Sequence, residues 1–368
     1  TTAQMKVKST FTNTGWDFVG ETTNGSDDIW TIEQDNRISY PYLLAFDYDE
    51  PGTEPAVNPI PGLSAPLYAG GMGTPEAPFQ IQTWEHLHNV RNNLDAHFVL
   101  NNNLDETTDG YATFVKDGET LANDGKGWEP IGNSDAEFIG KFNGGSHAIK
   151  AMEINRPTQD EIGLFGVIGT SGEVLRLGVS VQISDGSDGA GGQLQVGGLV
   201  GINKGNIQQV YVRGVVVGTT TVGDSVGNNN GIIENSYATA SVKGNMVAGF
   251  VGSNAGIINN SFSTGAIRVE ATSKFEASFG GFIAQIEGGE VNNSYWDKES
   301  SGSIFTSAGT GKNTFQMKTA STFLNAGWDF DSVWAIEDGA SASYPYLQTV
   351  SQDPAPGLVE YFAVGDGS

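Results

Sequence analysis

The sequence predicts an all-β fold: a parallel β-solenoid (β-helix) with one short N-terminal capping helix and aromatic-rich tail segments. The main observation is a recurring apolar position at intervals of 33, 26, 25 and 33 residues, occupied by Val174, Ile207, Ile233, Ile258 and Val291. Glycine and asparagine turns punctuate each interval, and glycine makes up 51 of the 368 residues, about twice its average share. A period near 25, with short strands between turns, is typical of one solenoid coil per repeat.

Three segments, 197–207, 225–233 and 250–258, align closely, and 163–174 and 280–291 are looser copies. Insertions at 184–194 and 268–279 account for the two longer intervals. Residues at one position of stacked coils face the same way, so we expect an interior aliphatic ladder with rungs about 4.8 Å apart. Two further columns are expected to follow it, namely a side-chain amide ladder of Asn235, Asn260 and Asn293 and an aromatic column of Tyr211, Tyr237, Phe262 and Tyr295.

A short amphipathic helix is predicted at about 84–94, in front of the coils. Thr83 stands at the N-cap position, and Leu87, Val90 and Leu94 follow at helical spacing. We expect this helix to cover the exposed end of the solenoid core, which an uncapped stack leaves open. The first strand is expected at 98–100.

The first forty-odd residues reappear at the end of the chain. Gly-Trp-Asp-Phe at 15–18 and Ser-Tyr-Pro-Tyr-Leu at 39–43 return at 327–330 and 343–347. We therefore interpret the chain as a piece of a longer tandem array, and interpret the array as a large surface or secreted repeat protein. The predicted domains are the tail of a preceding module (1–44), a Pro-rich acidic linker (45–66), a solenoid module with its own tail (67–347) and the start of the next linker (348–368). Residues 1–43 are expected to fold like 313–347, with the tail aromatics docked on a solenoid end. The first copy is expected to dock on helix 84–94 of the following module or on a neighbouring chain.

Composition excludes several classes of function. There are 43 acidic and 18 basic residues, a net charge of −25, which argues against nucleic acid and anionic membrane surfaces as partners. No cysteine is present, so disulfides, thiol catalysis and cysteine-zinc sites are excluded. No apolar run is long enough to span a membrane, and no nucleophile elbow or phosphate loop is found.

The repeat pattern Gly-Gly-Leu-Val-Gly-x-Asn-x-Gly-x-Ile, together with an Asn-Ser-Tyr that follows it at 235–237, resembles the GLUG repeat of bacterial surface proteins. Copies lie at 197–211, 226–237 and 249–262, and Asn-Ser-Tyr-Trp-Asp at 293–297 closes the series. This resemblance implies a β-solenoid within a large adhesin-type protein, and it implies no reaction. Ser225 replaces an apolar residue of the pattern, so that coil is expected to be locally irregular.

Two acidic groups are candidate calcium ligands. Asp185 and Asp188 lie in an insertion that resembles an oxygen-rich calcium loop, and Asp47 and Asp49 lie at the module junction. Oxygen-only ligands favour calcium over zinc or copper. A bound ion would offset self-repulsion and stiffen the chain; the alternative is that these acids are simply solvated.

Three tryptophans, Trp84, Trp128 and Trp296, could stack on sugars if their rings are exposed; the alternative is packing in the core or cap. The four histidines, His86, His88, His97 and His147, are expected to be structural. His86 and His88 are two residues apart on the predicted helix and therefore point to different faces.

The expected function is a structural, presenting module of an extracellular, cell-surface adhesin. Its partners would be neighbouring modules of the chain and a glycan, host or biofilm surface, and a homo-oligomer stays open. No catalytic residue is assigned. One alternative is a polysaccharide lyase or glycosidase, which needs paired carboxylates on one groove. The other is an ice- or surface-binding solenoid, which needs a flat threonine column; Thr219–Thr221, Thr239 and Thr264 do not align in this way.

Overall fold

The computed structural model describes residues 67–184, 195–269, 278–337 and 342–352, together with two short strands near the N-terminus. The chain divides into two compact units, Thr1–Ala65 and Pro66–Ser368. In the first unit, β1 (Trp30–Thr31) and β2 (Tyr42–Leu43) pair antiparallel, with Trp30 opposite Leu43 and Thr31 opposite Tyr42.

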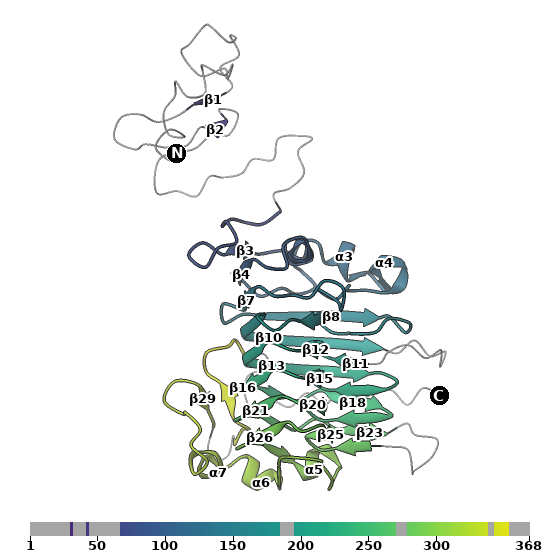
Figure 1. Cartoon of the computed structure of the whole chain (residues 1–368), viewed down its shortest axis with the longest axis vertical. Helices are drawn as coiled ribbons and strands as arrows, with labels where there is room; N and C mark the ends of the chain where they lie inside the picture. The colour runs from purple at the N-terminus through teal and green to yellow at the C-terminus, as the bar shows by residue number, and fades with distance from the viewer. Residues whose placement is uncertain are drawn as a thin grey trace, which may run out of the picture. The chain divides into compact units, whose positions relative to one another are not determined.

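The second unit is the predicted parallel β-solenoid, in which successive coils stack strand upon strand (Figure 1). One side of the coils forms a 15-stranded sheet of β3 (Phe79–Ile81), β4 (His97–Leu100), β7 (Lys141–Asn143), β8 (Ala148–Asn155), β10 (Glu173–Ser184), β13 (Asn206–Val217), β16 (Ile232–Glu234), β17 (Tyr237–Ala238), β18 (Ser241–Gly244), β21 (Ile257–Asn259), β22 (Phe262–Ser263), β23 (Ile267–Val269), β26 (Glu290–Asn292), β27 (Tyr295–Asp297) and β28 (Thr310–Lys312). A five-stranded sheet contains β9 (Phe165–Ile168), β12 (Val200–Asn203), β15 (Val226–Asn229), β20 (Val251–Asn254) and β25 (Ile283–Ile286). A four-stranded sheet contains β11 (Gln195–Gly197), β14 (Thr221–Gly223), β19 (Met246–Ala248) and β24 (Ser278–Gly280).

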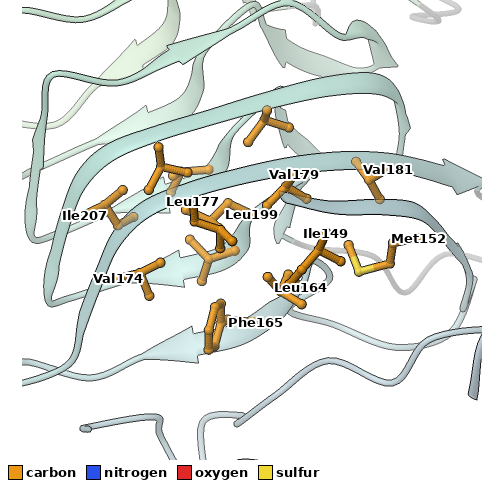
Figure 2. Close-up of a cluster of buried hydrophobic side chains, with 14 of the residues drawn as sticks. Ile149, Met152, Leu164, Phe165, Val174, Leu177, Val179, Val181, Leu199 and Ile207 are labelled. Atoms are coloured by element: carbon orange, nitrogen blue, oxygen red, sulfur yellow. The ribbon is translucent and has the colours of Figure 1, made fainter. Parts of the chain in front are cut away.

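The aliphatic ladder is confirmed. Val174 pairs with Ile207, Ile207 with Ile233 and Ile233 with Ile258, and all four side chains are fully buried. Val291 continues the column at its last rung, where it is half-buried. Figure 2 shows Val174 and Ile207 one above the other, with Leu177, Val179, Leu199 and their neighbours filling the space between the sheets. Repetition of one apolar position thus builds one continuous core.

The predicted amide ladder was wrong in its residues. Asn235, Asn260 and Asn293 lie at a corner of the coil in the left-handed backbone conformation, with φ of 48°, 47° and 47°. Asparagine tolerates this conformation better than most side chains, which accounts for its recurrence there. Arg176 and Gln209 occupy the same corner in earlier coils, at φ of 51° and 54°.

The buried amide ladder consists of Asn203, Asn229 and Asn254, whose side chains are all fully buried. The Asn203 Nδ2 donates to Asn229 Oδ1 at 2.8 Å, and the Asn229 Nδ2 donates to Asn254 Oδ1 at 2.7 Å. Ile168 and Ile286 occupy the same register position in the flanking coils, so the ladder is bounded by apolar residues on both sides. Its outer amide groups are satisfied by Gly205 N–H and Gly256 C=O.

A serine ladder follows the left-handed corner. Ser236 Oγ accepts from Val210 N–H, Ser261 Oγ from Ser236 N–H and Ser294 Oγ from Ser261 N–H, at 3.1 to 3.2 Å. The corner interrupts the backbone ladder, and these hydroxyls supply the missing acceptor for each buried N–H, as burial requires. The coil that contains Ser225 was expected to be irregular, but its backbone hydrogen bonds to both neighbouring coils are intact. Leu199 N–H donates to Ser225 O and Ser225 N–H donates to Phe250 O, each at 3.0 Å.

The capping helix is confirmed but shorter than predicted. Helix α2 spans Trp84–Asn89 and continues as a 3₁₀ turn, η2 (Val90–Asn92). Thr83 is the N-cap, and its Oγ1 accepts from His86 N–H at 3.1 Å. The cap also contains α3 (Tyr111–Phe114), α4 (Ala122–Gly125) and the hairpin of β5 (Lys116–Asp117) and β6 (Thr120–Leu121), which the sequence analysis did not anticipate. The strand predicted at 98–100 is β4, and β3 precedes it.

The tail begins after β28 and packs beside the last coils (Figure 1). It contains α6 (Thr314–Met317), α7 (Ala320–Leu324), β29 (Trp334–Ala335) and β30 (Tyr346–Leu347), and α5 (Lys298–Ser301) lies just before β28. Strands β29 and β30 pair antiparallel, with Trp334 opposite Leu347 and Ala335 opposite Tyr346. Aligned residue by residue, this is the register of β1 and β2 in the first copy.

Candidate functional site

The most extensive built site in the described residues is an aromatic column and the tail that covers it. The column, as named here, is Tyr211, Tyr237, Phe262 and Tyr295, which pair in register from strand to strand. The rings of Tyr211 and Tyr237 stack at 5.3 Å, and those of Tyr237 and Phe262 at 5.0 Å. Val210 and Val212, on either side of Tyr211, belong to the interior core, so strand alternation directs the column to the outer face.

The tail covers the column with a second set of aromatic rings. Phe262 contacts the rings of Phe323, Trp328, Trp334 and Tyr344 at 5.9 to 6.4 Å. Together with the column, the buried tail residues form a hydrophobic cluster separate from the interior core. The aromatics of this tail therefore dock on the side of their own solenoid, not on its end as the sequence analysis expected.

Polar contacts fix the tail in one position on the solenoid. The Trp328 Nε1 donates to Asn293 O at 2.9 Å, and the Trp334 Nε1 donates to Asn235 Oδ1 at 3.3 Å. Two acceptors lie in the segment that follows β30. The Tyr211 hydroxyl donates to Ser351 O at 2.8 Å, and the Tyr237 hydroxyl donates to Gln352 Oε1 at 2.6 Å. The indole and phenol groups thus join apolar burial to directional hydrogen bonds, as buried Tyr and Trp usually do.

Asp297 joins the last coil to α5, α6 and the tail. Its side chain is fully buried, and Oδ1 caps α5 by accepting from Glu299 N–H and Ser300 N–H. Oδ2 accepts from the Thr314 hydroxyl at 2.8 Å and from the Tyr344 hydroxyl at 2.7 Å. Burial, and then the adjacent carboxylate of Asp297, raise the pKa of Tyr344 well above its usual value. The carboxylate therefore holds the tail in place and has no free lone pair directed at solvent.

A cationic cluster lies in the N-terminal cap. Arg91 donates to the carbonyls of His88 and Glu129 and lies 5.2 Å from the centre of the Trp128 ring. Arg156 donates from Nε to Trp128 O at 2.8 Å. Burial lowers the pKa of Arg91 to about 10, and burial followed by repulsion from Arg91 lowers the pKa of His88 to about 4. Arg91 thus holds the segment around Trp128 to the 3₁₀ turn that continues the capping helix, and Arg156 holds it to the end of β8.

The three tryptophans predicted as sugar-stacking candidates are all buried. Trp84 and Trp128 are 0% exposed and Trp296 is 2% exposed. The rings of Trp84 and Trp128 lie 5.8 Å apart in the cap, and each indole N–H donates to a backbone carbonyl. Trp296 packs in the core above Gly281, where an added Cβ would lie 1.9 Å from its ring. Stacking on a glycan required exposed rings, and the structure shows packing in the cap and core instead.

The calcium candidates Asp47, Asp49, Asp185 and Asp188 lie outside the described residues, so calcium binding there stays a prediction. Within the parts of the chain that the structure describes, no group of three or more histidine, aspartate or glutamate side chains could hold a metal ion. Two of the histidines have evident structural contacts: His86 Nδ1 accepts from Gln82 N–H, and the His88 ring stacks on Phe114 at 4.4 Å.

A buried carboxyl group at Asp224 was missed by the sequence analysis. Its side chain is fully buried, and neither oxygen has a hydrogen-bond partner of normal geometry; the backbone N–H of Ala240 lies near enough to offset part of the effect of burial on the pKa. Burial raises its pKa well above the usual value. The corresponding residues of the other coils are Gly163, Gly198, Gly249 and Gly281. The sequence signal was therefore a single acidic residue at a position that is otherwise glycine. The register places Ala238 where the adjacent coils have Val212 and Ser263, and this small residue is consistent with room for the carboxyl group.

Comparison with known proteins finds relatives for parts of this chain. No protein-family model matches it. The chain is 40% identical over 149 residues to a protein of Evansella cellulosilytica provisionally named a Gly-rich membrane protein, a match that covers 40% of this chain and 16% of that protein. It is 31% identical over 177 residues to halomucin of Haloquadratum walsbyi, covering 46% of this chain and 2% of halomucin. The chain thus spans a small fraction of the length of the curated relatives it matches.

A solved structure has the same fold. The crystal structure of a Bacteroides ovatus protein, provisionally named an immunoglobulin A1 protease, superimposes with a TM-score of 0.50 at 18% identity, over 77% of this chain and 96% of that chain. At this identity the likeness concerns the fold alone. Among the residues that the structure describes, no helix combines the length and apolar character needed to cross a membrane.

Proposed function

We propose that this chain is a structural, presenting module of a large extracellular cell-surface protein of the adhesin type. The observation that carries the proposal is the continuity of the ladders. Aliphatic, amide and serine columns run from coil to coil, so that each coil is held chiefly by its neighbours, as in other repeat proteins. The amide side chains bond to one another, and the serine hydroxyls bond to backbone groups of their own and the adjacent coil, so that neither column is directed into a cleft.

The names and sizes of the relatives support the same proposal. One relative is named for a membrane association, and the matched segments are 16% and 2% of their parent proteins. A net charge of −25 favours solubility and disfavours adsorption to nucleic acid. The two buried acids among the described residues, Asp224 and Asp297, are both 0% exposed to solvent, and their burial supports a module without catalysis. We further propose that the module binds a glycan or a host or biofilm surface.

The proposal is tested on intact cells of the source organism. An antibody raised against residues 67–352 should label non-permeabilised cells, and mild protease treatment of whole cells should remove the label. A cytoplasmic protein of the same cells, probed in parallel, serves as the control for lysis. Label that appears only after permeabilisation would contradict a surface location. A glycan array, run with and without calcium, tests the glycan partner separately.

A further inference from the structure

We propose that the aromatic column is a docking site for tail sequences in general, and that residues 4–43 of a second copy of this chain bind it when the chain's own tail is displaced. The inference concerns association between copies and does not depend on the surface location proposed above. It follows from a comparison of the docked tail with the first copy of the same sequence.

The tail residues that are buried against the solenoid are repeated in the first copy. Five of the seven buried apolar residues in the described part of the tail are Met317, Phe323, Trp328, Trp334 and Leu347; the other two, Val333 and Val350, are replaced by other apolar residues in the first copy. The first copy has the same residue types at Met5, Phe11, Trp16, Trp30 and Leu43. Since Phe323, Trp328 and Trp334 make ring contacts with the column, the first copy contains the aromatic groups that the column contacts.

The polar anchors of the docked tail are repeated as well. Trp328, Trp334 and Tyr344 donate to Asn293 O, Asn235 Oδ1 and Asp297 Oδ2. Their counterparts Trp16, Trp30 and Tyr40 carry the same donors. Strands β1 and β2 also have the register of β29 and β30, so the hairpin that presents the second tryptophan is common to both copies.

The two copies differ in two places: the first copy has eight more residues between its tryptophans (Trp16 to Trp30 is 14 positions, Trp328 to Trp334 is 6), and the copies diverge after the hairpin. Both differences favour the chain's own tail. Thr349 donates to Gln209 Oε1 at 2.8 Å, and Gln352 accepts from Tyr237. Counting from Leu43, the first copy has Ala45 and Tyr48 at these positions, so it loses both contacts. The chain's own tail is also tethered beside the column, and tethering raises its effective concentration to the order of millimolar for a short flexible connection. The intact chain is therefore expected to keep its own tail docked.

The test disables the chain's own tail and leaves the first copy intact. The full chain with Trp328→Ala and Trp334→Ala is compared with the wild type by sedimentation velocity over a range of protein concentrations. We expect the wild type to stay monomeric at micromolar concentration and the double variant to form dimers and higher species. Adding Trp16→Ala and Trp30→Ala should restore a monomer, because the incoming segment then lacks its own anchors.

Two controls separate specific docking from exposure of a sticky surface. If the variant carrying all four substitutions associates as strongly as the double variant, the column is binding non-specifically and the proposal fails. A double variant that keeps its circular dichroism spectrum and stays monomeric would also overturn it. Should the double variant lose its native spectrum, the same comparison is made with Trp334→Phe alone and then together with Trp30→Phe.

A covalent lock can be introduced at a chosen pair of positions, because the chain has no cysteine of its own. Gln209→Cys and Thr349→Cys place two thiols on facing segments whose native side chains meet in a hydrogen bond, within reach of a short bifunctional thiol-reactive cross-linker. Cross-linking this pair in the chain with the disabled tail should hold the tail over the column and prevent association, whereas the same chain without the cross-linker should still associate. Association that is unchanged by the lock would show that the column is not the binding surface.

Discussion

The buried amide ladder provides the sharpest test of how the coils are held together. Asn229 lies at its centre: it accepts from Asn203 Nδ2 at 2.8 Å, donates to Asn254 Oδ1 at 2.7 Å and accepts from Gly231 N–H at 3.3 Å. Its side chain is 0% exposed. Asn229→Ala therefore removes the partner of several buried polar groups that water cannot reach.

The expected cost follows from the groups left unpaired. Asn254 Oδ1 and Gly231 N–H lose their partners, and Asn203 Nδ2 keeps only contacts of 3.4 and 3.5 Å. An unsatisfied buried group costs about 1–3 kcal/mol, so Asn229→Ala should lower the free energy of unfolding by about 3–5 kcal/mol. That is a large part of the roughly 5–15 kcal/mol by which natural domains are stable.

The assay is urea unfolding followed by far-ultraviolet circular dichroism, with Asn230→Ala as the matched control. Asn230 is the adjacent residue in sequence, its side chain is exposed, and exposed substitutions usually change stability by less than about 0.5 kcal/mol. A loss below about 1 kcal/mol for Asn229→Ala, or equal losses for the two variants, would refute the reasoning that the ladder stabilises the stack.

Four further predictions concern other features of the chain. Asp224→Asn should be more stable than the wild type at pH 7 and should lose this advantage near pH 4 in urea unfolding. The reason is that burial raises the pKa of Asp224 above its usual 3.8. The protonated side chain stabilises the fold fully below pH 3.8, and this stabilisation is lost as the pH rises through the pKa of the folded state. An advantage that does not change with pH would count against this. Asn260→Ala should lower the free energy of unfolding by about 1 kcal/mol and Asn260→Gly by much less, because residue 260 has a φ of 47°, a conformation that costs other side chains about 1–2 kcal/mol. Equal losses of the two variants in thermal melts would disprove this prediction. Asp297→Asn should weaken tail docking by about 2–3 kcal/mol, so that limited proteolysis removes the tail before it cuts the coils. Cleavage of the tail at the wild-type rate would contradict the role given to this carboxylate. Calcium bound by Asp47 and Asp49, or by Asp185 and Asp188, should raise the melting temperature through mass action, and identical midpoints in calcium and in chelator at matched ionic strength would mean that these acids are only solvated.

The solenoid could be predicted because its determinants are periodic. One apolar residue per coil specifies the interior column from Val174 to Ile258, and the spacing alone reveals it. The aromatic column was predicted for the same reason. The period could not show which asparagine column faces inward, because Asn229 and Asn235 recur with nearly the same spacing. The left-handed corner at Asn235 breaks the alternation of the strand, and only the three-dimensional backbone shows on which side each asparagine lies.

The site was less predictable because its two halves are distant in sequence. Tyr237 hydrogen-bonds to Gln352, and nothing in the local pattern of either residue indicates the other. The matching tails indicated that the segment is a unit, but not that it covers the side of the coils. Asp224 was visible only as an acid in a glycine column. The burial of Trp84 and Trp128 likewise depends on the short helices of the cap, which carry too few residues to show a clear period.

Native-state hydrogen exchange of β12, β15 and β20 tests the central claim, that the described coils form one cooperative stack held by their ladders, most directly. The account predicts that amides of all three strands exchange only through global unfolding, with one common free energy, and that Asn229→Ala lowers this free energy in all three strands together. Exchange of any one of these strands within minutes at neutral pH, while the others stay protected, would contradict it.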